Sequence, residues 1–127
     1  MNFILQVPPY PVEVMVSIGQ SDKKLFKCID KWAVKKKEKK RLKESVKSDF
    51  ADDVCYGIVH HLQDTGFIIL RTDGKIKSAY YRGVLAHEIF HVVEEITTHA
   101  GVKHGRKSSE AFAYLTSYLT TEIYKRL

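Results

Sequence analysis

Hydrophobic and polar positions alternate over residues 12–18, and this alternation predicts a β-strand. Valines at every second position stand against Glu13 and Met15, and Gly19 ends the stretch. Residues 1–11, which carry three prolines, read as an extended lead with a proline kink. The chain therefore starts with one predicted strand after an irregular lead.

A second β-rich region follows further along the chain. Residues 54–62 and 66–72 are rich in Val, Ile, Tyr and Phe, and the polar residues 63–66 between them predict a hairpin turn. Residues 73–74, Asp-Gly, predict a second turn. Residues 76–79 fit either a brief third strand or the approach to the next helix.

Helical spacing replaces alternation after the first strand. Ser21 and Asp22 are favourable helix-capping residues, and apolar residues recur behind them at helical intervals. The apolar stripe consists of Leu25, Cys28 or Ile29, Trp32 and Ala33, and Leu42 and Val46 continue it. A run of lysines interrupts this stripe, so we expect the second half of the helix to project, fray or bend.

A long helix is predicted from near Tyr80 to beyond Thr97, with one apolar and one polar face. Its apolar face consists of Leu85, Ile89, Phe90, Val92, Val93 and Ile96. Its opposite face consists of Val84, His87, His91, Glu94 and Glu95. Such a helix packs against the core on one side and presents ligands on the other.

The last helix is predicted from about Ser109 to the end of the chain, with Ser108 as its N-cap. Its apolar stripe consists of Phe112, Leu115, Leu119 and Ile123. Its opposite face consists of Glu110, Tyr114, Ser117 and Thr121. A turn through Gly101 and Gly105 predicts that this helix returns antiparallel to the preceding one.

The predicted order is strand, helix, strand, strand, helix, helix. This order is typical of an α+β fold, with a small twisted sheet, an N-terminal helix and two C-terminal helices. A chain of 127 residues fits a single domain with one core. Residues 1–53 supply the first strand and the lysine-rich helix, and residues 54–127 supply the hairpin and the two C-terminal helices.

Composition adds one local feature, a basic run. The net charge is +6, and residues 31–47 alone contain nine Lys or Arg against two Glu, a net charge of +7. Cys28 and Cys55 lie outside any CxxC spacing, which favours reduced core cysteines over a disulfide or metal ligands. The apolar residues 1–7 lack a basic start and meet prolines, so we expect a cytoplasmic protein with no signal peptide and no membrane partner.

Residues His87-Glu88-Ile89-Phe90-His91 form an HExxH motif. On a helix, two histidines four residues apart lie on one face and can reach a single metal ion. Glu88 lies about 100° round the helix from His87, where its carboxylate can take a proton from a water without being a ligand. The motif predicts a catalytic zinc site with His87 and His91 as ligands and Glu88 as the general base.

Glu110 is the candidate third ligand. It lies on the outward face of the last helix, and eighteen residues separate it from His91. An HExxH motif followed at this distance by Ser-Glu-Ala-Phe-Ala resembles the gluzincin zinc peptidases, above all the stand-alone minigluzincins. The resemblance covers roughly residues 54–127 and implies one Zn²⁺ per chain, held by His87, His91 and Glu110, with water in the fourth position.

The resemblance also implies how a substrate binds. Gluzincins bind a peptide along an edge strand above the zinc helix, and we expect residues 54–62 or 66–72 to form that edge. They supply an oxyanion donor from beyond the third ligand, where this chain offers Tyr114, Tyr118 and Tyr124. Tyr114 stands where thermolysin-like members keep an Asp that supports a zinc histidine, and its hydroxyl is the candidate for that supporting role.

The small size of the chain separates it from larger gluzincins, which carry a second subdomain below the cleft. The floor of the cleft must come from the last helix, the N-terminal part or a partner chain. We find no motif for a substrate amine, which favours an endopeptidase acting on a peptide or protein. Short proteins of this style resemble those encoded in bacterial and phage genomes.

Three other interpretations stay open. The histidines and Glu110 fit solvated surface positions too, with Glu110 favoured by the helix dipole. A non-catalytic zinc module would explain the missing subdomain, although it has no use for Glu88. Nucleic acid could bind residues 31–47, but a solvated helix face is the more common fate of such a run, and we do not expect this partner.

Two further pairs of side chains have candidate roles. Glu94 and Glu95 are either acceptors that support a zinc ligand or members of a solvated face, and the solvated face is favoured. His60 and His61 alternate on a predicted strand, so we expect one to face the core or cleft and the other to face solvent.

Overall fold

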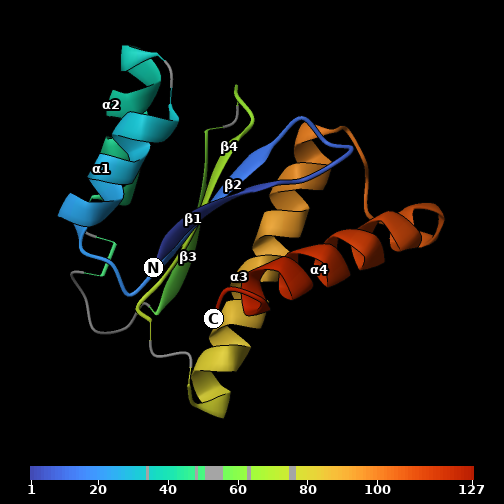
Figure 1. The fold of residues 1–127 in the computed structure, drawn as a ribbon. Helices are drawn as coiled ribbons and strands as arrows, with labels where there is room; N and C mark the ends of the chain where they lie inside the picture. Colours follow the sequence, from blue (N-terminus) through green and yellow to red (C-terminus); the bar gives the residue numbers. More distant parts are fainter. Residues whose placement is uncertain (34, 48, 51–55, 63, 75–76) are drawn as a thin grey trace.

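The computed structural model has an α+β fold, and it describes residues 1–127 except 34, 48, 51–55, 63 and 75–76 (Figure 1). Its elements are β1 (Asn2–Gln6), β2 (Glu13–Ile18), α1 (Asp22–Trp32), α2 (Lys36–Val46), β3 (Gly57–Leu62), β4 (Phe67–Thr72), α3 (Ala79–His99), the 3-10 helix η1 (Arg106–Ser108) and α4 (Ser109–Tyr124). The predicted fold class is confirmed.

Four strands form one mixed sheet in the order β1-β2-β4-β3. β1 and β2 are antiparallel, β2 and β4 parallel, and β3 and β4 antiparallel. The hairpin predicted between β3 and β4 is therefore confirmed, and β3 is the strand at one edge of the sheet. β3 lies within residues 54–62, one of the two segments that we expected to form the sheet edge above the long helix.

β1 is a strand that the sequence pattern did not predict. Its five residues pair with β2 from Asn2 opposite Ser17 to Gln6 opposite Glu13. A single side chain of this strand, that of Leu5, is buried, so the alternation is too weak to read. The prolines that follow turn the chain back into β2 and do not form a lead.

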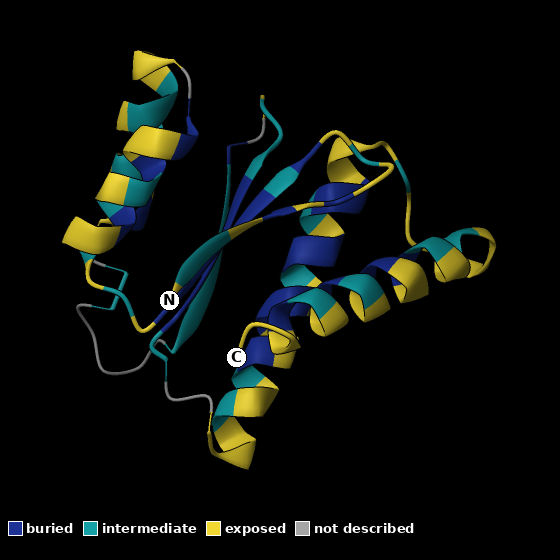
Figure 2. Cartoon of the chain, in the orientation of Figure 1, coloured by how far each residue is buried: buried dark blue, intermediate teal, exposed yellow. Residues whose placement is uncertain are grey.

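Helices cover both faces of the sheet. Figure 1 shows α1 and α2 on one side of it and α3 and α4 on the other, and Figure 2 shows that each helix buries the side facing the strands. Successive residues of β2 therefore enter different cores: Val14 and Val16 pack with α3 and α4, whereas Met15 packs with α1 and α2. The α3 core is the larger of the two.

The lysine-rich helix is broken into two helices. Ser21 caps α1 by accepting a hydrogen bond from the Lys24 N–H, as its position predicted. Ala33 and Lys35 adopt extended backbone conformations and end one helix before the next begins. The break lets Leu42 and Val46 of α2 turn back onto the sheet and bury, which a straight continuation past the sheet would not allow.

α3 and α4 occupy nearly the predicted ranges, and the apolar stripe of α4 is buried as predicted. Phe90 was predicted to lie on the buried apolar face of α3, but this residue is 45% exposed, so that part of the prediction is wrong. Ser108 occupies the N-cap position of α4, as predicted, but its hydroxyl makes no capping hydrogen bond and donates to the carbonyls of Lys103 and Gly105. Within residues 76–79, the described residues lead into α3, whose N-cap is Ser78.

α4 crosses α3 obliquely and does not return antiparallel to it (Figure 1). Two tyrosine contacts join α4 to the N-terminal strand region. The Tyr118 hydroxyl donates to the Gln6 carbonyl at 2.8 Å, and the Tyr114 hydroxyl donates to the Pro8 carbonyl at 3.2 Å. These contacts hold α4 towards β1, at the opposite edge of the sheet from β3.

A buried arginine joins the helices of the other layer to the sheet. Arg71 of β4 is 2% exposed and donates to the carboxylates of Asp22 and Asp49 and to the Val46 carbonyl. His60 lies 2.9 Å from the same Asp49 carboxylate, on the α2 side of β3. The expectation that one of the paired histidines faces solvent is therefore wrong.

Of the two cysteines, Cys28 lies in the part of the chain that the structure describes. Cys28 of α1 carries a free thiol, which accepts a hydrogen bond from the Asn2 side-chain amide at 3.3 Å. It is partly buried at the edge of the core beneath α1. Cys55 lies outside the described residues.

Candidate metal centre

α3 brings the two motif histidines into contact. The Nε2 atoms of His87 and His91 lie 3.0 Å apart, and their ring centroids lie 4.6 Å apart. Two nitrogen ligands on a tetrahedral zinc ion, each about 2.0–2.1 Å from the metal, are separated by about 3.3 Å. The pair therefore presents two nitrogen donors at nearly the separation that a shared zinc ion requires.

Glu94 orients one of these rings. Its Oε2 lies 2.8 Å from Nδ1 of His91, so the carboxylate accepts the Nδ1–H hydrogen bond. This tautomer leaves the Nε2 lone pair of His91 free to face His87 or a metal ion. Glu94 lies at the solvated position that the sequence favoured, with a side chain that is 47% exposed, and it is also hydrogen-bonded to His91.

Glu88 is the buried polar residue of the motif, with 6% of its surface exposed. It packs against the start of β3, where a Cβ atom on Gly57 would come within 2.6 Å of Cγ and 2.9 Å of Oε1 of Glu88. Burial raises the pKa of Glu88, and the neighbouring His87 and His91 act in the opposite direction. The glycine thus leaves room for a carboxyl group held between the sheet edge and the histidines.

An open cleft of about 350 Å³ connects these residues. It is lined on one side by Gly57, Ile58 and Val59 of β3, and on the other by His87, Glu88, His91 and Glu95 of α3. The sequence predicted the motif residues of this cleft. It did not assign Gly57 to the cleft, because nothing local in the sequence pairs the start of β3 with the middle of α3.

Glu95, which also lines this cleft, is paired with His61 of β3. Oε2 of Glu95 lies 2.6 Å from Nδ1 of His61, and Nε2 of His61 lies 3.1 Å from the Thr65 carbonyl. Carboxylate and carbonyl oxygens are both acceptors, so each ring nitrogen of His61 faces an acceptor. Glu95 is thus half-buried and paired, where the sequence favoured a solvated position.

The structure does not bring Glu110 to the histidine pair. Glu110 is exposed in the first turn of α4, which Figure 1 shows at a distance from the middle of α3. Within the part of the chain that the structure describes, no three His, Cys, Asp or Glu side chains lie close enough to hold a metal ion. In these residues, the histidine pair has no third protein ligand beside it.

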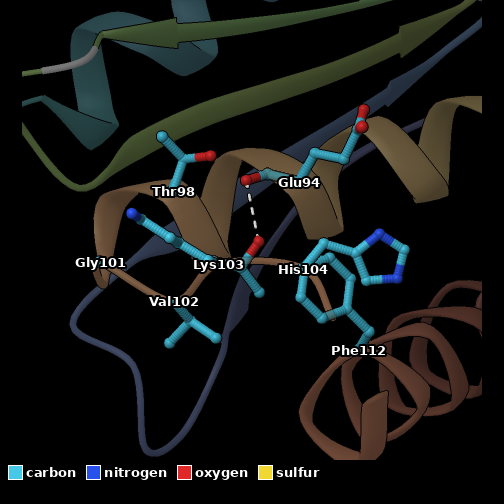
Figure 3. A pocket seen from close by; sticks show the side chains of 8 residues that line it. Glu94, Thr98, Gly101, Val102, Lys103, His104 and Phe112 are labelled. Atoms are coloured by element: carbon cyan, nitrogen blue, oxygen red, sulfur yellow. Dashed lines mark hydrogen bonds between the residues drawn. The ribbon is translucent and has the colours of Figure 1, made fainter. Parts of the chain in front are cut away.

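A pocket of about 430 Å³ lies between the end of α3 and the start of α4 (Figure 3). The residues that line it are Glu94, Thr97, Thr98, Gly101, Val102, Lys103, His104 and Phe112. The His104 ring stacks on Phe112 with centroids 4.3 Å apart, and Val102 lies beside them. This space lies next to Glu94, which supports His91, and next to the α4 turn that carries Glu110.

The predicted oxyanion donors lie away from the cleft. Tyr114 and Tyr118 are hydrogen-bonded to the β1–β2 connection, so Tyr114 does not support a zinc histidine here. Tyr124 lies near the C-terminus and is 39% exposed. A separate tyrosine cluster, which the sequence reasoning missed, consists of Tyr56, Tyr80 and Tyr81 at the beginning of α3.

No helix in the described part of the chain combines the length and the apolar character that a membrane crossing requires. Comparisons with protein-family models, with curated proteins and with solved structures found no match to this chain.

Proposed function

We propose that this protein is a zinc-dependent metallopeptidase that hydrolyses peptide bonds in a peptide or protein substrate. The observation that carries the proposal is the pair of Nε2 atoms 3.0 Å apart, with the buried carboxyl group of Glu88 beside them in an open cleft. A purely structural zinc site has no use for that carboxyl group.

Each residue of the cleft has a role in this proposal. His87 and His91 hold the zinc ion, and Glu94 keeps His91 in the tautomer that can bind it. A bound zinc ion would supply Lewis-acid activation of a water and of the scissile carbonyl. Glu88 accepts the proton of the attacking water and passes it to the leaving amine.

The third ligand in this proposal is Glu110. Ligation requires the first turn of α4 to approach α3, across the pocket that holds the stacked rings of His104 and Phe112. The connection through residues 100–108 is almost entirely exposed, which suits it to such a movement. Glu95, which already lines the cleft, is the alternative carboxylate that an experiment must separate from Glu110.

The edge strand β3 supports binding of an extended substrate. It pairs with β4 on one side, and its outer side has no strand neighbour among the described elements. A peptide added along that outer side would pass over Glu88 and the histidine pair, because Gly57, Ile58 and Val59 line their cleft. This arrangement suits an endopeptidase that reads backbone more than side chains.

Zinc content of the purified protein tests the metal site. We expect about one zinc per wild-type chain by elemental analysis, and a large loss in His91→Ala. Comparing Glu110→Ala with Glu95→Ala then identifies the carboxylate ligand, because only the true ligand should weaken zinc affinity strongly. Wild-type protein that stays metal-free in added zinc would refute the site.

Cleavage of a casein or random-peptide substrate tests the catalytic role. Glu88→Gln should keep the zinc and lose turnover by at least about 10²-fold, the lower range for general base catalysis. Equal activity of wild type and Glu88→Gln would reject the assignment. A zinc-loaded wild type without any activity, matched by Glu88→Gln, would favour the structural zinc module instead.

A further inference from the structure

The helical layer on the far side of the sheet from the cleft carries most of the positive charge of the molecule. Residues 22–47, which form α1, α2 and their flanks, contain twelve Lys or Arg and four Asp or Glu, a net charge of +8. Since the whole chain carries +6, all remaining residues together carry −2. We call this layer the basic face.

Few of these charges are neutralised within the protein. In the described residues, the ion pairs of the basic face are Lys43 with Asp30, Arg41 with Asp64, and Asp22 with Arg71 of β4. Ten lysines take part in none of the described ion pairs: Lys23, Lys24, Lys27, Lys31, Lys35, Lys36, Lys37, Lys39, Lys40 and Lys47. Nine of them are exposed and Lys39 is half-buried.

The lysines stand on folded helices, which changes the interpretation of the run. Leu25, Ile29 and Trp32 of α1 and Leu42 and Val46 of α2 are buried against the sheet. Figure 2 shows that the outer sides of both helices are largely exposed. The basic residues are therefore held on one rigid surface, and α1 adds four lysines to those of α2 and its flanks.

We propose that the basic face binds the phosphate backbone of nucleic acid without sequence preference. α2 is about 16 Å long at the usual helical rise, a length over which duplex DNA presents about ten negative charges. Residues 22–47 contain no Asn or Gln, and Arg41 is already paired, so the amide and guanidinium groups that read adenine and guanine by two hydrogen bonds are not available. Lysines of this density contact phosphates and release counterions.

The same surface does not suit insertion into a membrane. An interfacial helix places large apolar side chains in the lipid, and none of the exposed large hydrophobic residues of the described chain lies in 22–47. The apolar residues of α1 and α2 are already used in the core. Because the basic face and the cleft lie on opposite faces of the sheet, nucleic acid and a peptide could bind together.

Fluorescence anisotropy with a labelled random-sequence DNA duplex tests this proposal. We expect the wild type to bind at 50 mM salt, with an affinity that falls steeply as salt rises. Lys36→Gln/Lys37→Gln/Lys40→Gln removes three exposed charges of the basic face and should lower the slope of log K against log salt by up to about 2.7. The charge-matched control Lys103→Gln/Arg106→Gln/Lys107→Gln removes three exposed charges near α4 and should leave the slope nearly unchanged.

Three outcomes would overturn the proposal: no wild-type binding at 50 mM salt, equal losses in both triple variants, or binding to phosphatidylserine vesicles without binding to DNA. Equal losses of DNA binding in the two triple variants would mean that the net charge of the protein, and not the basic face, determines the affinity.

Amide NMR of the wild-type protein provides a second readout that needs no variant. DNA should shift signals of α1 and α2, and shifts confined to α3 and α4 would contradict the assignment. None of these outcomes depends on zinc or on peptidase activity.

Discussion

Glu88 is a buried carboxyl group that also lines the open cleft. It must reach the cleft to act as a base, yet 6% exposure removes most of its hydration. Burial raises its pKa above that of an unfolded-chain glutamate. Between the unfolded and the folded pKa the native state binds more protons than the unfolded state, so stability falls as pH rises through this interval.

Glu88→Gln should therefore stabilise the metal-free protein at pH 8. The advantage over wild type should shrink as the pH falls and disappear below about pH 4, near the pKa of an unfolded glutamate. Thermal unfolding in a chelator across this pH range measures the difference. Glu110→Gln, at an exposed position, controls for the loss of one carboxylate. A constant difference between Glu88→Gln and wild type at all pH values would contradict the burial argument.

Gly57 is the neighbour that makes room for Glu88. An added methyl group would lie 2.6 Å from Cγ of Glu88, so Gly57→Ala must displace the carboxylate or the strand. We expect a loss of about 1–3 kcal/mol in the free energy of unfolding. Gly83→Ala is the matched control, because that glycine lies inside α3 with no atom within 4 Å of the added group. It should stabilise the protein by about 0.5–1 kcal/mol.

At the scale of elements, sequence patterns predicted best those helices whose apolar stripe is buried in one core. α3 and α4 have such stripes, and their ranges were nearly correct. β1 was missed because Leu5 is its single buried residue. The break before α2 was not located, because a run of lysines contains no apolar positions that show where one helix ends and the next begins. The HExxH contact followed from helical spacing, whereas the tyrosine contacts of α4 join residues more than 100 positions apart, which no local pattern in the sequence predicts.

Arg71 is a contact of this long-range kind, since it joins β4 to α1, to α2 and to Asp49. Arg71→Ala should lower the free energy of unfolding by about 3–5 kcal/mol, because it leaves the Asp49 carboxylate, whose side chain is 4% exposed, without its main cation. Urea unfolding measures the loss. Arg41→Ala breaks an ion pair on the surface and should have little effect. Similar effects of the two variants would mean that Arg71 contributes no more than a surface charge.

The whole molecule is a sheet with a different chemistry on each face. The helices on one side of the sheet carry the histidines, which lie beside the edge strand β3. The helices on the other side form the basic face. Zinc should couple to the fold of the first face, because the ligands that we propose come from α3 and from the first turn of α4. Closure of that turn over the pocket would join two helices that at present meet obliquely.

Zinc at about 100 times its Kd should stabilise the native protein by about 2.7 kcal/mol, which raises the Tm by roughly 10 °C for a domain of this size. His91→Ala should abolish the rise. Hydrogen exchange separates ligation by Glu110 from ligation by Glu95: Glu110 requires zinc to slow exchange in the first turn of α4, whereas Glu95 requires protection near the cleft alone. Zinc-dependent stabilisation without added protection in α4, retained in Glu110→Ala, would show that the second helix takes no part in the metal site.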